Sequence, residues 1–387
     1  MTLLGFVPSI ALLGLTTALT AGVGATSRPD RPLAEGQPCR LTVSARPAVT
    51  IKSADNTGLF YRITGGVFVG GGGVVVVSSG TQSVLAFSRE GRFERTFGRK
   101  GEGPGEFRFL SGLWRFDDST LMVSDNPKAR VTLFNHTLDN PRSVALQSAT
   151  GVRWPAVVGV AGGSIVAING QAFERGQLGV GTVRPPYQFL RYSRDGALRD
   201  TLIVVAGREF HVPQDDTARP TRAIPLGVDV LHATSDIGLH LLSTDGGRIT
   251  RVRQRNREEV FATLPTVRQR ITAADVARYK AAQRADAVTP AQQRAAALLD
   301  EMPFPQHFPT ADALLVDGAG AVWARRVATQ PSEWSAWDRV SRDGRTQCAA
   351  RIPTSVRLLD ADAERVLGVM TDGDGEESIV VYAIGRS

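Results

Sequence analysis

Four short segments of the chain share one pattern: Ser88-Arg89-Glu90-Gly91, Ser193-Arg194-Asp195-Gly196, Ser243-Thr244-Asp245-Gly246 and Ser341-Arg342-Asp343-Gly344. Each segment lies between two runs in which apolar and polar residues alternate. Asp-Gly or Glu-Gly between two alternating runs predicts a β-hairpin, because glycine readily adopts the positive φ that such a turn needs. The four segments therefore predict four hairpins spread along the chain.

The spacing of these segments predicts the architecture. Their glycines are separated by 105, 50 and 98 residues. These spacings fit a repeat of about 50 residues that lacks the motif once and carries one insertion; the missing hairpin is assigned to a turn near His136-Thr137. A repeat of about this length, made of four short strands, is typical of propeller blades. We therefore predict an all-β fold, a six-bladed β-propeller.

The predicted blades cover residues 58–98, 107–147, 153–206, 224–265, 310–353 and 355–385. The last blade has only about three strands of its own. The alternating segment 43–51 is predicted to supply its missing outer strand, so that an N-terminal strand closes the last blade. Closure of the ring removes sheet edges that would otherwise be exposed. The propeller domain then covers residues 43–387.

A second stretch carries a more specific pattern. It reads Phe97-Gly98-Arg99-Lys100-Gly101-Glu102-Gly103-Pro104-Gly105-Glu106-Phe107, then Leu121-Met122-Val123-Ser124-Asp125 and Ala129-Arg130-Val131-Thr132-Leu133-Phe134. A Gly-rich link, a strand ending in Asp and a strand opening with Arg-Val resemble an NHL-type repeat. The rest of the chain is similar to exported bacterial six-bladed propellers of the TolB-like and NHL-like kind. This resemblance implies a fold and not one activity.

One segment is not predicted to be β. Thr272-Ala273-Ala274-Asp275 and Thr289-Pro290-Ala291-Gln292 each open a helix with a capping-box pattern. This insertion, about residues 272–302, lies between blades four and five. It is either a lid or partner-docking element, or a structural cover for one end of the channel. We favour the structural cover.

The N-terminus predicts export. Residues 3–27 carry no charge, and Val23-Gly24-Ala25 supplies the small residues that precede a signal-peptidase cut at Ala25-Thr26. The prediction is a signal peptide over residues 1–25, a linker over 26–42 and a secreted or periplasmic mature protein. A retained anchor is the alternative, because about 20 apolar residues can span a bilayer. No later segment is apolar enough for a transmembrane span.

The chain has two cysteines, Cys39 and Cys348, too few for a thiolate zinc cluster or a dense disulfide scaffold. Export places both in an oxidising compartment, so we predict that they form a disulfide. Cys348 lies in the predicted outer strand of blade five, and Cys39 just precedes the closing strand of blade six. The bond would tie the closing strand to the ring. Two buried, unpaired thiols are the alternative.

The net charge is +7, and 41 of the 45 basic residues are arginine. Arg251, Arg253, Arg255 and Arg257 recur every second residue, so a strand there would project all four to one face. This face is a candidate site for an anionic glycan, a lipid headgroup or an acidic protein, because arginine binds carboxylate and phosphate bidentately. The alternative, which we favour, is a solvated outer strand. Nucleic acid is not expected, because no aromatic residues interleave the arginines.

Catalytic chemistry is only weakly indicated. None of the five histidines has a zinc-ligand spacing, although His232 and His240 lie on two strands of one predicted hairpin and could face each other. Asp125 and Asp317 each follow a predicted strand. Carboxylates at such places can bind ligand at the mouth of a propeller. More often they accept backbone N–H groups in a tight turn, and we favour this second interpretation.

The sequence therefore predicts an exported binding or scaffold module for an unidentified ligand or protein partner, with no cofactor. The alternative is a metal-dependent propeller enzyme, a lyase, lactonase or other hydrolase with a divalent cation in its channel. That alternative requires at least three His or carboxylate side chains that converge on the channel. No catalytic or metal-ligating residue can be named from the sequence.

Overall fold

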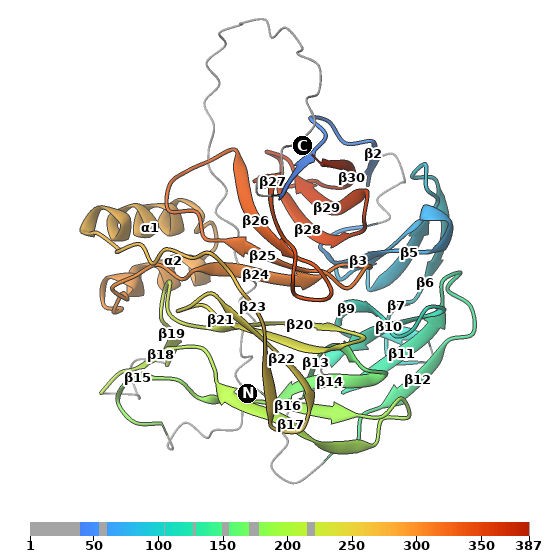
Figure 1. The fold of residues 1–387 in the computed structure, drawn as a ribbon, viewed down its shortest axis with the longest axis horizontal. Helices are drawn as coiled ribbons and strands as arrows, with labels where there is room; N and C mark the ends of the chain where they lie inside the picture. The colour runs from blue at the N-terminus through green and yellow to red at the C-terminus, as the bar shows by residue number, and fades with distance from the viewer. Residues whose placement is uncertain are drawn as a thin grey trace, which may run out of the picture.

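The computed structural model describes residues 39–53, 60–103, 105–126, 129–148, 155–169, 178–214 and 221–386. This part of the chain is predominantly β, and it contains two α-helices in one insertion (Figure 1). The predicted signal peptide and residues 26–38 of the predicted linker lie outside the described residues. No helix of the described part is long and apolar enough to cross a membrane.

Four of the described sheets are four-stranded and antiparallel, and each consists of strands that are close in sequence. The first contains β3 (Ile63–Phe68), β4 (Val74–Ser78), β5 (Ser83–Phe87) and β6 (Phe93–Phe97). The second contains β9 (Leu110–Arg115), β10 (Thr120–Asp125), β11 (Arg130–Asn135) and β12 (Arg142–Ala145). The third contains β13 (Ala156–Ala161), β14 (Ser164–Asn169), β16 (Pro186–Tyr192) and β17 (Leu198–Ala206). The fourth contains β20 (Val230–Ser235), β21 (Gly238–Ser243), β22 (Arg248–Gln254) and β23 (Arg257–Thr263).

The C-terminal strands form two further antiparallel groups. One group contains β24 (Ala311–Val316), β25 (Val322–Arg326), β26 (Trp334–Val340) and β27 (Gln347–Pro353). The other contains β28 (Val356–Ala361), β29 (Arg365–Thr371) and β30 (Glu377–Arg386). The N-terminal strand β1 (Cys39–Val43) joins them, because it pairs parallel with β27 and antiparallel with β30. Strand β2 (Val49–Lys52) pairs with β30 as the outer strand of the last group.

The N-terminal closure thus uses two strands where the sequence predicts one strand over 43–51. Pro47 lies in the gap between β1 and β2; proline has no backbone N–H, which disfavours a continuous strand there. Residues 39–42, assigned to a linker, belong to β1. Their alternating pattern of burial continues into Val43, which is buried. Cys39 lies opposite Cys348 in the β1–β27 register, and the two form a disulfide with a Cα–Cα distance of 4.5 Å.

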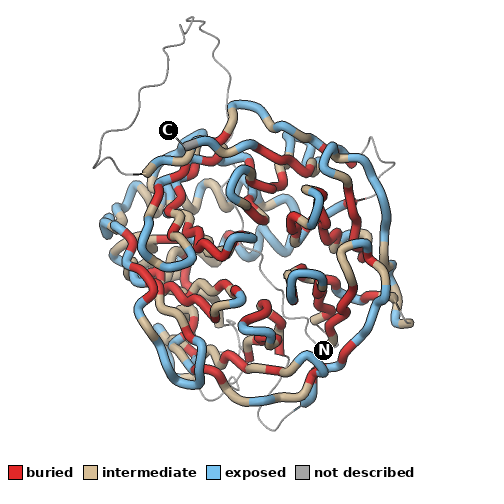
Figure 2. Tube along the Cα trace, turned by 45° about the vertical axis from the view of Figure 1, so that its right-hand side comes forward, coloured by how far each residue is buried: buried red, intermediate tan, exposed pale blue. Residues whose placement is uncertain are grey.

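The first strand of each antiparallel group is its innermost strand. Neighbouring inner strands contact each other in the order β3, β9, β13, β20, β24, β28, and β28 returns to β3. The groups therefore surround a common centre (Figures 1 and 2). Buried apolar side chains fill the space between neighbouring groups; Leu85 of the first sheet and Leu367 of the last group, for example, belong to one cluster.

Three of the four repeated turns occupy the same place, between the third and fourth strands of a group. Gly196 and Gly344 have φ of +85° and +78° there. A Cβ on Gly196 would lie 2.2 Å from the backbone oxygen of Ala145, and one on Gly344 would lie 2.4 Å from that of Phe261. Ala145 and Phe261 belong to the outer strands of the preceding sheets. Glycine is therefore required both by the turn and by the packing of neighbouring sheets.

The fourth segment, Ser243–Gly246, does not match the others in position. It joins the second strand to the third strand of its sheet, β21 to β22. The turn between the third and fourth strands is instead at Arg255-Asn256, where Asn256 adopts a φ of +53°. The 50-residue spacing that suggests one repeat at this point therefore aligns two different turns.

The insertion contains α1 (Ala273–Ala285), α2 (Pro290–Ala297) and the short 3₁₀ helix η5 (Leu298–Asp300), between β23 and β24. Both helices begin with the predicted capping boxes, Thr272 with Asp275 and Thr289 with Gln292. Ala296 is the one buried residue of the two helices. The remaining short elements are η2 (Gly70–Gly72), the pair β7 (Arg99–Lys100) and β8 (Glu106–Phe107), and the sheet of β15 (Gly181–Val183), β18 (Phe210–Val212) and β19 (Arg222–Ala223).

Candidate functional site

A cavity of about 540 Å³ lies at the centre of the ring. All six inner strands contribute to its lining, which places it where ligand sites are expected in a ring of sheets. Its volume suits a small molecule, since ligand pockets are typically about 300–1,000 Å³. The lining is mixed: apolar side chains such as Val67, Val158 and Leu315 alternate with charged groups.

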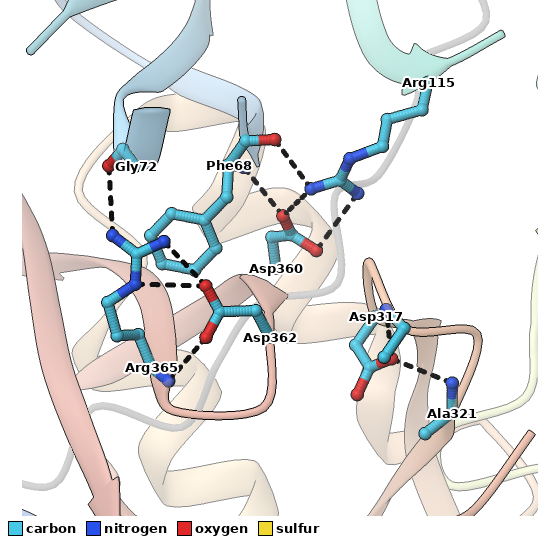
Figure 3. A network of polar contacts seen from close by, with 9 residues as sticks. Phe68, Gly72, Arg115, Asp317, Ala321, Asp360, Asp362 and Arg365 are labelled. Atoms are coloured by element: carbon cyan, nitrogen blue, oxygen red, sulfur yellow. Dashed lines mark hydrogen bonds and ion pairs between the residues drawn. The ribbon is translucent and has the colours of Figure 1, made fainter. Parts of the chain in front are cut away.

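One ion pair among the lining residues lies at the C-terminal ends of two inner strands, β9 and β28 (Figure 3). Arg115 of β9 donates from Nη2 to Asp360 Oδ2 of β28 at 2.5 Å and to the backbone oxygen of Phe68 at 2.9 Å. The backbone N–H of Phe68 donates to the same Asp360 oxygen at 2.8 Å. Burial raises the pKa of Asp360, and Arg115 opposes that effect. The pair therefore links three groups of strands, and it provides hydrogen-bond partners for the backbone N–H and C=O of Phe68 at the end of β3.

Arg365 makes a second connection beside it (Figure 3). Its Nε and Nη2 donate to Asp362 Oδ2 at 3.0 and 2.7 Å, and its Nη1 donates to the backbone oxygen of Gly72 at 3.0 Å. The guanidinium also lies 4.1 Å from the centre of the Phe68 ring. These contacts hold the β28–β29 turn against the first sheet.

Asp125 and Asp317, the two aspartates singled out in the sequence, hold turns and neighbouring side chains. Asp317 accepts the backbone N–H groups of Ala319 and Ala321 and the indole N–H of Trp323, at 2.8–2.9 Å. Asp125 accepts the N–H of Phe109 at 2.9 Å. Arg339 and Arg130 pair with Asp317 and Asp125, respectively. Asp317 lines the central cavity, but its oxygens are already occupied by these donors.

Arg194 and Arg342, which lie in two of the repeated turns, form further ion pairs between neighbouring sheets. Arg194 Nη1 lies 2.8 Å from Asp117 Oδ2, and Arg342 Nη1 lies 2.8 Å from Asp236 Oδ1. Burial disfavours the charge of Asp117, but hydrogen bonds from neighbouring groups outweigh this and lower its pKa to about 2. Asp117, Asp236 and Arg342 all line the cavity, so its rim carries charges that are already paired.

Sequence reasoning missed Asp360, Arg115 and these partner aspartates. The signal for Asp360 was present, because it follows the run Val356–Leu359 just as Asp125 and Asp317 follow theirs. No comparable signal marked Arg115. Its partners lie 245 and 47 residues away, and only the ring topology brings them together.

The predicted arginine face does not form, because the four residues do not share a strand. Arg251 and Arg253 lie on β22, Arg255 lies in the turn, and Arg257 begins β23. The turn at Arg255-Asn256 reverses the chain, so the alternation that predicted a common face ends there.

Two of these arginines share one carboxylate. Glu259 Oε1 lies 2.8 Å from Arg251 Nε and 2.9 Å from Arg253 Nε, and hydrogen bonding from Arg251 contributes most to the lowered pKa of Glu259. The Arg251 guanidinium also stacks over Phe261. Arg257 donates to the side chain of Gln254 at 3.3 Å. The structure therefore does not bring the four together as one anion site.

His232 and His240 lie on neighbouring strands but on opposite faces of their sheet. His232 is opposite Leu241 and His240 is opposite Ala233 in the β20–β21 register, and directly opposite residues share a face. His232 contacts Phe189, whereas His240 contacts Phe261. The two imidazoles do not face each other. Within the described part of the chain, no group of three or more His, Cys, Asp or Glu side chains is arranged to hold a metal ion.

No family model and no curated protein matches the chain. Solved structures to which it is similar include a putative exported protein from Bacteroides fragilis (10% identity, TM-score 0.49, 90% of this chain and 95% of that one). A DUF4221-family member from Bacteroides vulgatus is also similar (10% identity, TM-score 0.48, 90% of this chain and 99% of that one). Virginiamycin B lyase from Staphylococcus aureus is similar too (11% identity, TM-score 0.41, 89% of this chain and 99% of that one). These likenesses are too distant to transfer a ligand or an activity, and the NHL-type resemblance stays a prediction.

Proposed function

We propose that this chain is an exported six-bladed β-propeller that binds a small ligand in its central channel and works as a binding or scaffold module. The observation that carries the proposal is the cavity of about 540 Å³ lined by every inner strand. The domain limits that accompany it are a signal peptide over 1–25 and a propeller that begins at Cys39 with β1. The proposal includes no reaction.

Two features support binding in this cavity. Neighbouring groups of strands share buried apolar clusters, and ion pairs such as Arg342 with Asp236 and Arg194 with Asp117 also join neighbouring sheets. A rigid site loses little conformational entropy when a ligand binds. The lining also combines apolar side chains with polar groups that fix orientation, which is the composition of most small-molecule sites.

A substitution that fills part of the cavity with a larger side chain tests this proposal. Thr64 is an exposed residue of the cavity lining, and Thr50 is an exposed residue of the outer strand β2. We expect Thr64→Trp to abolish binding of small molecules that the unchanged protein selects from a mixed library in saturation-transfer NMR. The matched control, Thr50→Trp, should retain those ligands. The proposal fails if no library member binds, or if Thr64→Trp binds the same ligands as well as the control does.

A further inference from the structure

The guanidinium of Arg357 differs from the other arginines that line the cavity. Arg115 and Arg342 each donate to a carboxylate at 2.8 Å or less. Arg357 has Glu377 as its carboxylate neighbour, but the two groups are 3.7 Å apart, beyond hydrogen-bond distance. One Arg357 hydrogen bond, from Nη2 to the backbone oxygen of Ile63 at 2.5 Å, uses one of its five N–H donors.

Glu377 is also committed elsewhere. Its Oε2 accepts the backbone N–H of Ile63 at 2.7 Å. It is mostly buried, with 15% of its side chain exposed, whereas 43% of the Arg357 side chain is exposed. Partial burial lowers the pKa of Arg357, and the carboxylate of Glu377 opposes this effect. An additional anion at this position would improve its electrostatic environment.

Arg357 lies at the end of the cavity opposite the Arg115–Asp360 pair. It is near the N-terminal end of β28, three residues before Asp360, which corresponds to about 10 Å along an extended strand. Its partner Ile63 begins β3, and the next residue, Thr64, is exposed in the same cavity. Among the described residues, the hydrogen bond to Ile63 uses one N–H of Arg357, and an exposed guanidinium with further N–H donors is a suitable site for an oxyanion.

We infer that Arg357 anchors an oxyanion, a carboxylate or phosphate group, of the ligand in the central cavity. This inference rests on the proposed function and adds the chemical class of the ligand. The rest of the ligand extends toward Arg115 along the apolar and polar wall of the inner strands. Because Glu377 remains beside the cation, the free anion alone binds weakly and the remaining contacts supply affinity.

Equilibrium dialysis with inorganic phosphate and with acetate tests the site. We expect one saturable oxyanion site per chain in the unchanged protein. Arg357→Gln should weaken it by at least about ten-fold, because a charge-assisted bidentate contact is lost. Arg46→Gln, which changes an exposed arginine between β1 and β2 that does not line the cavity, should bind the anions as well as the unchanged protein. Binding of phosphate but not acetate would favour a phosphate-bearing ligand, and the reverse a carboxylate.

Arg357→Lys is the second variant, because Arg357→Gln also removes the hydrogen bond to Ile63 and could unfold. Lysine keeps the charge and loses the planar pair of donors, so binding should be intermediate. Equal binding in Arg357→Lys and the unchanged protein, no saturable binding of either anion, or an equal loss of binding in Arg46→Gln would each overturn the inference. Neutral library members that bind the unchanged protein but not Thr64→Trp would still support the proposed function. In that case only the inference of an oxyanion on the ligand would fail.

Discussion

His240 gives the most quantitative prediction about stability. Its side chain is fully buried on β21, where Nε2 lies 3.1 Å from Ser235 Oγ and the ring packs 4.8 Å from the ring of Phe261. Burial is the main reason that its pKa falls from 6.5 to about 4; Arg251 adds to the effect, and Asp236 opposes it. The folded protein therefore binds fewer protons at this site than the unfolded chain does.

The sign of the pH dependence follows from that difference. Stability from neutral His240 is fully present above about pH 6.5 and is lost as the pH falls toward 4. With these two pKa values, the loss between pH 7.5 and pH 4.5 is about 2.5 kcal/mol. His240→Gln removes the titrating group and keeps a polar side chain beside Ser235, so that part of the pH dependence should disappear.

Urea unfolding at pH 7.5 and pH 4.5 measures this effect. We expect the free energy of unfolding to fall by about 2.5 kcal/mol less in His240→Gln than in the unchanged protein. His211→Gln, a histidine outside this cluster, controls for the loss of one imidazole. The reasoning is wrong if the fall in His240→Gln matches that of the unchanged protein within about 0.5 kcal/mol.

Two further predictions concern the ring. Replacing Cys39 and Cys348 together by Ser should lower the denaturant midpoint, because the bond closes a 309-residue separation that constrains the unfolded chain by about 5–6 kcal/mol at most; an unchanged midpoint would show that it does not stabilise closure. Gly344→Ala should cost about 2–4 kcal/mol, since its Cβ would meet Phe261 O at 2.4 Å with a positive φ, whereas Gly246→Ala has open space and should cost less than about 1 kcal/mol in the same unfolding assay.

Much of the fold could be predicted because its signals are local. The alternating runs, the Gly-containing turns and the two capping boxes each depend on a few neighbouring residues. The error at Ser243–Gly246 shows the limit of such signals. A Ser-x-Asp-Gly turn has the same local chemistry between any two strands, so the motif alone does not say which two strands it connects. The strand predicted through Arg257 failed for a separate reason: the arginines continue to recur at every second residue across the turn at Arg255-Asn256.

The candidate site was harder to predict because it depends on contacts between distant segments. Arg357 meets Ile63 across 294 residues, and Arg115 meets Asp360 across 245. Neither arginine differs in its local sequence from the many others in an arginine-rich chain. The disulfide could be predicted for the opposite reason: a chain with two cysteines has one possible intramolecular pairing, and the predicted export favours its formation.

The proposed anion site and the contact between the first sheet and the last group of strands both involve the backbone of Ile63. Ile63 begins the first inner strand, and both of its backbone polar groups are satisfied by the last group: its N–H donates to Glu377 and its C=O accepts from Arg357. A ligand that binds Arg357 only in the closed ring must therefore stabilise closure by linkage. At a ligand concentration of 100 times Kd, that stabilisation is about 2.7 kcal/mol. The seam where the two ends of the chain meet would then be the part of the ring that is most strengthened by the ligand.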